Sequence, residues 1–183
     1  MPSDINLLME DANLIFRNFA GEERQYNRKG DRNFCVTLHP DAANEMLKDG
    51  WNVKYLKARE EGDEPQAYIQ TTVSFKGRPP TLVMVTSRGR TNVPEDMVEM
   101  FDWVEIKTVD LIIRPYDWEV SGKTGRKAYL KSMYLTLDED YLALKYAHVQ
   151  EIGAEENHVL DSKYDGLPIL DGEVVPDRLA IGN

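Results

Sequence analysis

Basic residues alternate with aromatic residues in several short segments of this sequence. One segment carries Arg24 and Tyr26, and a later one carries Arg114, Tyr116 and Trp118. Cationic side chains can follow a phosphate backbone, while flat rings accept unpaired bases and contribute about 1–3 kcal/mol per stacked base of any identity. The combination therefore predicts binding of single-stranded nucleic acid. The alternative is that the rings fill a core and the cations lie on its solvated surface.

Tyr26 is expected to be exposed and to stack on a base, because it lies in a charged stretch without apolar neighbours. Trp51, Phe75 and Tyr134 are instead assigned to the core, where large rings are usually found. The complete set of predicted nucleic-acid-binding residues is Arg24, Tyr26, Arg28, Lys29, Arg32, Lys54, Lys57, Arg78, Arg88, Arg90, Arg114, Tyr116, Trp118, Lys123, Arg126 and Lys127.

Motifs for catalysis are missing from the sequence. Gly122-Lys123-Thr124 resembles the end of a phosphate-binding loop, but Asp117 occupies the position of the required upstream glycine. Acidic clusters at 60–64 and 138–140 could hold Mg²⁺ in a nuclease, although solvation and helix capping explain them better. The single cysteine and three scattered histidines offer no zinc-site spacing. We therefore expect a binding protein without a metal or cofactor, and not an enzyme.

Short extended segments dominate the elements that must position these residues. Residues 68–75 and 82–85 are predicted to pair as a hairpin across the turn at 77–80, and Asp41 is predicted to cap the first helix. Residues 121–125 are predicted to form a tight turn, and Pro115 to end a strand. The predicted strands are 13–19, 33–38, 51–56, 68–75, 82–85, 106–115, 118–120 and 128–137, and the predicted helices are 41–48, 94–103 and 138–146.

These elements predict a mainly β fold: an OB-fold-like Greek-key β-barrel with two or three short helices and an acidic C-terminal tail. We divide the chain into an N-terminal arm (1–11), an OB-like single-stranded-DNA-binding domain (12–147) and the tail (148–183). Hairpin tips of such barrels commonly line the binding groove, so the turn cluster Lys123, Arg126 and Lys127 is expected to contact phosphates.

The net charge of −10 is unevenly distributed. Residues 1–134 hold 19 basic and 21 acidic residues, whereas residues 135–183 hold 3 and 11, which gives balances of −2 and −8. This asymmetry predicts an acidic tail that competes with DNA for the groove and, once displaced, recruits replication or recombination proteins. The sequence carries no signal-peptide pattern and no membrane-spanning apolar run, so a soluble, cytoplasmic protein is expected.

A family resemblance rests on four stretches of the sequence, Tyr26–Phe34, Asp49–Lys54, Val109–Tyr116 and Lys127–Tyr134. Together they resemble a family of small bacteriophage proteins described as single-stranded DNA-binding proteins with an OB-like fold. The resemblance covers roughly residues 12–147 and leaves the tail outside. It implies sequence-nonspecific binding of single-stranded DNA during phage replication or recombination, in the cytoplasm of a bacterial host cell.

Two other functions remain open from the sequence. The net charge of −10 is compatible with a phage interaction module, an inhibitor or adaptor that presents an acidic, DNA-mimicking surface to a host protein. A metal-dependent nuclease is the third reading, and the lack of a carboxylate–histidine motif disfavours it. The sequence leaves the oligomeric state open, including a homo-oligomer.

Overall fold

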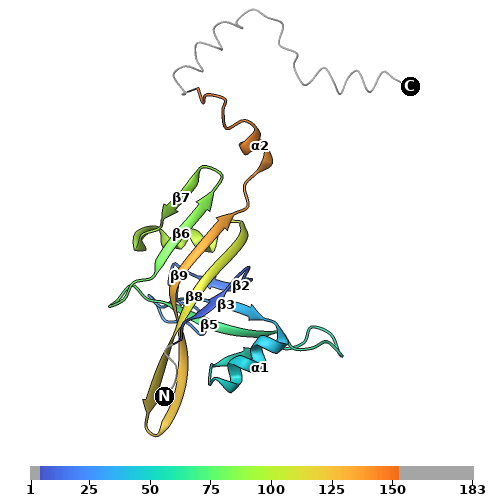
Figure 1. Cartoon of the computed structure of the whole chain (residues 1–183), viewed down its shortest axis with the longest axis vertical. Coiled ribbons are helices and arrows are strands. Elements are labelled where there is room, and N and C mark those ends of the chain that lie inside the picture. Colours follow the sequence, from blue (N-terminus) through green and yellow to red (C-terminus); the bar gives the residue numbers. More distant parts are fainter. Residues whose placement is uncertain (1–4, 153–183) are drawn as a thin grey trace, which may run out of the picture. The chain divides into compact units, whose positions relative to one another are not determined.

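The computed structural model describes residues 5–152, and β-strands make up most of its regular structure, which confirms the predicted mainly β class (Figure 1). The chain divides into two units, Met1–Tyr141 and Leu142–Asn183. In chain order the elements are β1 (Leu7–Met9), β2 (Leu14–Asn18), β3 (Arg32–Leu38), α1 (Pro40–Lys48), β4 (Val53–Tyr55), β5 (Ala67–Val73), β6 (Thr81–Thr86), β7 (Gly89–Asn92), the 3₁₀ helix η1 (Glu95–Asp102), β8 (Ile106–Val120), β9 (Lys123–Leu137) and α2 (Tyr141–Lys145).

The main path of the sheet forms a partly open barrel. Its order is β1-β8-β9-β5-β3-β2, and the neighbours are antiparallel except for the parallel pair β5–β9. The two ends of the path, β1 and β2, follow one another in the chain, and the Ala12 amide between them donates to the Val109 carbonyl of β8 at 2.8 Å. β1 and β2 thus act as one bent first strand that pairs with β8 and then with β3. This is the strand order of an OB-type Greek-key barrel.

β6 and β7 form an additional hairpin outside that path. β6 pairs in parallel with the second half of β9, from Thr81 opposite Ser132 to Val85 opposite Thr136. The predicted hairpin of 68–75 with 82–85 is therefore wrong, because β5 and β6 lie beside different parts of β9. The physical reason is the connection: prolines 79 and 80 have fixed φ and no amide hydrogen, so this segment crosses over instead of closing a ladder.

A β-bulge at Lys131 decides which side chains of β9 fill the barrel. The pairs Ile113–Leu130 and Ile112–Ser132 flank it, so Lys131 is an extra residue without a residue opposite it in β8. Buried positions therefore advance by three residues here, from Leu130 to Met133, instead of by two. Because of the bulge, both halves of β9 point their apolar residues inward, although these residues occupy even positions before Lys131 and odd positions after it.

Three phenylalanines join the barrel to the helix η1. Phe19 stacks on Phe34 with ring centroids 5.2 Å apart and meets Phe101 edge-on at 5.5 Å. All three side chains are fully buried, and burial stabilises the fold by about 1.5–3 kcal/mol for each. The Asp102 carboxylate accepts hydrogen bonds from the amides of Phe19 and Ala20, at 2.7 and 2.9 Å. The predicted helix over 94–103 is thus present, but as a 3₁₀ helix.

Helix α1 covers one end of the barrel with Ala43 and Met46. It begins one residue earlier than predicted, with Pro40 in its first turn, so the predicted cap, Asp41, is wrong. His39 caps the helix instead, because proline is favoured at the first helical position. The Nδ1 atom of His39 accepts a hydrogen bond from the Asp41 amide at 3.4 Å. Gly50, with φ +83°, follows the helix and lets the chain turn toward β4.

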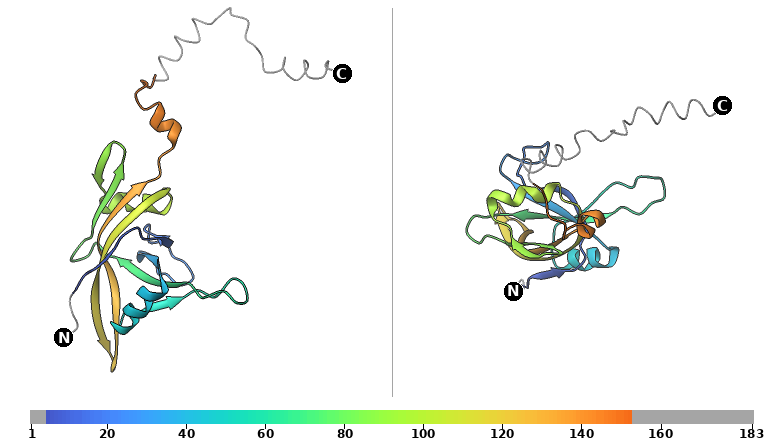
Figure 2. Two further views of the ribbon diagram at one scale, coloured as in Figure 1. Left: turned by 45° about the vertical axis from the view of Figure 1, so that its right-hand side comes forward. Right: turned by 90° about the horizontal axis from the view of Figure 1, so that it is seen from above.

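β8 and β9 form a long hairpin whose turn end extends beyond the neighbouring strands (Figures 1 and 2). β8 continues through Pro115, where the sequence predicted a break. β1 pairs with β8 only as far as Ile113, so Pro115 lies on an edge, where its missing amide hydrogen is tolerated. The turn is shorter than predicted, Ser121 and Gly122 alone, with φ of 51° and 75°.

The structure tests the predictions for the N-terminal arm and the closing helix, but not the prediction for most of the tail. Leu7–Met9, within the segment assigned to an arm, form β1. The predicted closing helix is present as α2, and residues 142–152 of the second unit are exposed. The predicted tail lies outside the described residues from 153 onward. Within residues 5–152, no helix combines the length and the apolar character needed to cross a membrane.

Candidate nucleic-acid interface

The two faces of the β8–β9 hairpin carry different chemistry. Residues directly opposite one another in an antiparallel pair share a face, and faces alternate along each strand. The pairs Arg114–Tyr129, Tyr116–Lys127, Trp118–Gly125 and Val120–Lys123 therefore form one face, and Asp117–Arg126 and Glu119–Thr124 the other. We name the first the outer face, defined by Arg114, Tyr116, Trp118, Lys123, Lys127 and Tyr129, and the second the inner face.

On the inner face, Arg126 is committed to contacts within the protein. Its Nε and Nη2 donate to the two carboxylate oxygens of Asp117 at 2.7 and 3.0 Å, and its guanidinium lies over the Trp51 ring, 5.5 Å from the centroid. Only 9% of Arg126 is exposed. The hydrogen bonds from Arg126 lower the pKa of Asp117. This cluster joins the hairpin to Trp51 of the barrel, so the geometry gives Arg126 a positioning role, while its predicted DNA contact stays a prediction.

On the outer face, cations lie over exposed or half-exposed rings. The Arg114 guanidinium and the Lys127 ammonium stand 5.6 and 5.3 Å from the centroid of Tyr129, which also meets Tyr116 edge-on at 5.7 Å. The Trp118 ring lies against the backbone of Gly125, where a Cβ atom would come within 2.6 Å of the ring. The outer face therefore presents rings for stacking with positive charge beside them.

One hollow, of about 300 Å³, lies between the loop before β3, the outward side of β5 and the hairpin. Tyr26 and Trp118 contribute aromatic rings to its lining, and Gln70 and Thr72 of β5 also line it. We name it the barrel groove. Its lining residues are Tyr26, Asn27, Asp31, Arg32, Asn33, Asn52, Ile69, Gln70, Thr72, Trp118, Arg126, Lys127 and Ala128.

A larger hollow, of about 930 Å³, lies beside the outer face near the 74–81 connection, and we name it the hairpin groove. Four of its lining residues are cationic, two are tyrosines, and among the described residues no carboxylate lines it. The Arg114 guanidinium is oriented here by the Arg78 carbonyl, 3.4 Å away. The lining residues are Asn6, Ser74, Lys76, Arg78, Pro79, Thr81, Arg114, Pro115, Tyr116, Tyr129 and Lys131.

The chain matches, over residues 3–183, the sequence family described as "Putative phage ssDNA-binding domain". The chain belongs to this family. The match includes the tail, so the prediction that the resemblance ends near residue 147 is wrong. No curated protein sequence matches the chain.

Solved structures similar to this chain include two bacteriophage proteins. The single-stranded DNA-binding protein of bacteriophage Enc34 in complex with ssDNA has a TM-score of 0.47 and 11% identity, covering 74% of this chain and 88% of that chain. The single-stranded DNA-binding protein gp2.5 of bacteriophage T7 has a TM-score of 0.37 and 13% identity, covering 82% and 98%.

Eight of the sixteen predicted binding residues line the barrel groove or the hairpin groove of this chain. Lys54 lies next to them, since its Nζ is 3.3 Å from Oε1 of Gln70 in the barrel groove. Tyr26 is 91% exposed, as expected for a ring outside the core. The groove-lining residues of the predicted set are Tyr26, Arg32, Arg78, Arg114, Tyr116, Trp118, Arg126 and Lys127.

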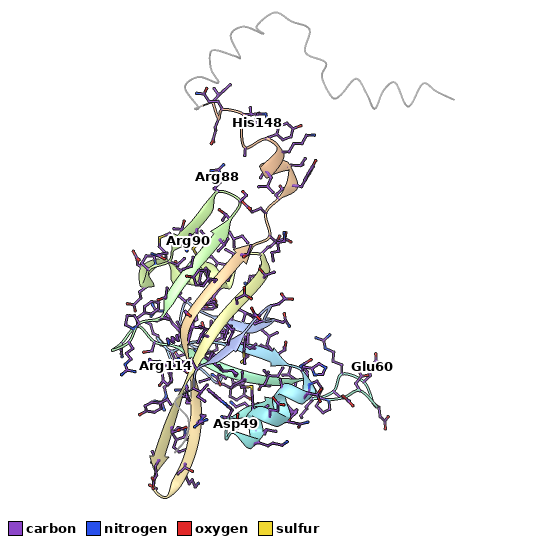
Figure 3. The ribbon with its side chains drawn as sticks, in the orientation of Figure 1. Asp49, Glu60, Arg88, Arg90, Arg114 and His148 are labelled. Carbon is purple, nitrogen blue, oxygen red and sulfur yellow. The ribbon has the colours of Figure 1, made fainter. Side chains whose placement is uncertain are left out.

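Other predicted residues lie elsewhere on the surface. Arg88 and Arg90 belong to the β6–β7 hairpin, well apart from Arg114 (Figure 3). Arg24 is held by the Glu22 carboxylate at 3.5 Å and by a backbone carbonyl. The remaining four members of the predicted set are exposed and also line neither groove, although one of them, Lys123, belongs to the outer face. They are Arg28, Lys29, Lys57 and Lys123.

The core assignments were correct for two of three aromatic residues. Trp51 is buried, and Phe75 packs against the core with the Arg32 guanidinium 5.4 Å from its ring centroid. Tyr134 is 42% exposed, so its assignment to the core is wrong. It follows the Lys131 bulge, which turns it outward next to the buried Met133.

The predicted binding set omits Lys76, Tyr129 and Lys131, which line the hairpin groove. All three belong to the basic–aromatic alternation of the sequence, and Lys127, Tyr129 and Lys131 also follow one another at the two-residue period of a strand face.

Proposed function

We propose that this protein binds single-stranded DNA without sequence preference along the outer face of the hairpin and its two grooves, in phage replication or recombination. The observation that carries the proposal is the cation–ring arrangement around Tyr129, beside a groove lined by four cations and no carboxylate among the described residues. Cations that follow phosphates and rings that stack on bases are the two requirements for this kind of binding.

Lack of sequence preference follows from the same side chains. Every base has a π-face, so Tyr116, Trp118 and Tyr129 can accept any base, and the neighbouring cations contact only the common backbone. We infer that the chain acts by binding and not by catalytic turnover. Within residues 5–152, no cluster of three or more metal-ligating side chains is present that would support the nuclease alternative.

The acidic-mimic alternative finds no support on the hairpin. The outer face carries Arg114, Lys123 and Lys127, and its companion carboxylates Asp117 and Glu119 project from the inner face. The surplus of negative charge lies in residues 135–183, most of which are outside the described residues. We retain the tail's competition with DNA, and its recruitment of other proteins, as a proposal from the sequence.

The deciding experiment is fluorescence anisotropy of labelled oligo-dT with the full chain over a series of salt concentrations. With about four phosphate contacts, log K should fall with log salt at a slope near −0.7 times four, or about −2.8. A labelled oligonucleotide of mixed sequence should bind with similar affinity, and a duplex of equal length more weakly. If oligo-dT does not bind at low salt, the proposed function is wrong.

A further inference from the structure

Phe16 projects into solvent from strand β2. Its side chain is 58% exposed and its φ is +50°. The regular pairing of β2 with β3 is interrupted between Ile15 and Asn18, so Phe16 lies in a bulge. A residue with a bulky ring rarely adopts this backbone conformation, and such conformations are concentrated at functional sites.

The exposed ring meets a second aromatic residue across the sheet. Phe16 and Tyr68 approach edge to face, with ring centroids 6.3 Å apart and planes at 73°. Tyr68 belongs to β5, and β3 lies between β5 and β2, so the pair spans the outward side of β3. Tyr68 alternates with buried residues of β5, as Gln70 and Thr72 do, and these three side chains therefore share the outward side.

Gln70 connects this aromatic pair to the barrel groove. Gln70 and Thr72 line the groove, and Tyr68 is the next outward residue of the same strand. Lys54 is paired with Tyr68 in the β4–β5 register, and its Nζ is 3.3 Å from Oε1 of Gln70. A cation is thus paired with Tyr68, one of the two rings, next to a residue that lines the groove. Positive charge beside an aromatic ring also characterises the outer face of the hairpin.

We propose that Phe16 and Tyr68 form a further base-stacking platform, reached by a single strand that continues out of the barrel groove, and that Lys54 contacts a phosphate there. The ligand of the platform is a nucleobase of any identity, because ring stacking does not read base edges. This inference rests on the proposed function and extends the interface from the hairpin across β5 and β3 to β2.

A purely structural role for the two rings makes different predictions. Cys35 faces outward between Ile15 and Gln70 in the sheet register, yet only 6% of it is exposed, and burial raises the pKa of its thiol to about 11. If the rings served only to cover this part of β3, their removal would lower stability and open Cys35 to thiol reagents. If the rings stack on bases, their removal should instead lower the affinity for DNA.

The variant Phe16→Gly separates the two roles. Glycine adopts positive φ without steric strain, so the melting temperature should stay close to that of the wild type. Affinity for oligo-dT should fall roughly 5- to 150-fold, the equivalent of one lost stacking contact. The salt slope should not change, because the ring carries no charge. Phe16→Trp restores a ring and should bind like the wild type.

Three further variants complete the test in the full chain. Tyr68→Ala should weaken binding as Phe16→Gly does while leaving the bulge untouched. Lys54→Gln should reduce the magnitude of the salt slope by about 0.7. Trp103→Ala removes an aromatic residue that is 70% exposed and lines neither groove, and its affinity should stay within about twofold of the wild type.

Two results would overturn the platform alone. In the first, Phe16→Gly and Tyr68→Ala bind oligo-dT as tightly as the wild type. In the second, these variants lose affinity only together with a matching fall in melting temperature and faster labelling of Cys35. Absence of oligo-dT binding by the wild type is a different outcome, because it rejects the proposed function and this inference together.

Discussion

The inner and outer faces of the β8–β9 hairpin are formed by alternate residues of the same two strands. Their cationic side chains nevertheless have different surroundings. On the inner face Arg126 is neutralised by Asp117 and packed against Trp51. On the outer face Arg114 and Lys127 lie over an aromatic ring, with no ion pair to either side chain among the described residues. Neighbouring cations of one strand can thus either stabilise the fold or remain available to a ligand, and the strand register decides which.

The largest effect is expected from removing charge on the outer side of the hairpin. The triple variant Arg114→Gln, Lys127→Gln and Lys131→Gln should reduce the magnitude of the salt slope by about 2.1, or 0.7 for each phosphate contact. At 50 mM salt this corresponds to an affinity loss on the order of several hundred-fold. The melting temperature should change little, since Lys127 and Lys131 are exposed. An unaltered slope would show that DNA does not follow this face.

The converse effect is expected on the inner face. Arg126→Gln should destabilise the fold by about 1–3 kcal/mol, because it removes two charge-assisted hydrogen bonds and the contact with Trp51. Thermal unfolding measures the loss. The salt slope of DNA binding should remain that of the wild type at temperatures where the variant is folded. A slope reduced by one phosphate contact, without destabilisation, would assign Arg126 to the ligand.

The same pair predicts an acid dependence of stability. Since the pKa of Asp117 is lower in the folded protein, the pair stabilises the fold above the unfolded carboxyl pKa of about 3.9. This contribution is lost as the pH falls through the lower, folded value. Comparing denaturant unfolding of wild type and Asp117→Asn from pH 7 to pH 2 should show a gap that closes in acid. A gap that is constant over this range would contradict the assignment.

A smaller effect is expected from disturbing Trp118, which lies on the outer face opposite Gly125. Gly125→Ala adds a methyl group that would lie 2.6 Å from the Trp118 ring, so the ring must move. Affinity for oligo-dT should fall about fivefold, at the low end of one stacking contact, while the salt slope is retained. Trp118→Ala provides the reference for complete loss of the ring. Binding that is lost with Trp118→Ala but normal in Gly125→Ala would mean that the ring orientation is unimportant.

The smallest effect is expected from Arg88 and Arg90. Both are exposed on the β6–β7 hairpin and line neither groove (Figure 3). The double variant Arg88→Gln and Arg90→Gln should therefore keep the affinity and slope of the wild type in the anisotropy assay, although the sequence places both residues in the binding set. A slope reduced by about 1.4 would extend the interface to this hairpin.

Local patterns predicted most of the strands because period-two alternation survives in the sequence. The alternation of Tyr68, Gln70 and Thr72 with buried residues is an example. Pairing between distant strands was less accessible. The hairpin predicted across Pro79 and Pro80 was wrong, because the parallel contacts of β5 and β6 with β9 depend on residues about 50 positions further along the chain.

The candidate site was predictable in composition and not in geometry. Basic–aromatic alternation marked Arg114, Tyr116 and Trp118 correctly as neighbours in one surface. It did not distinguish Arg126 from Lys127, since the partner of Arg126 is set by the cross-strand register. Phe16 gave no signal at all, because its exposure results from a bulge and a positive φ within an otherwise apolar strand.

The bent first strand also sets the order in which the molecule can assemble during synthesis. Leu14 pairs with Val36, only 22 residues later, whereas the partner of Leu7 is Ile113, far along the chain. Contacts between such distant residues require closure of a long loop and are typically slow to form. A growing chain on the ribosome can thus pair β2, β3 and β5 early, but the barrel and its hairpin come together only after β9 has emerged. Binding activity is therefore acquired late in translation, when nearly all of the first unit has been made.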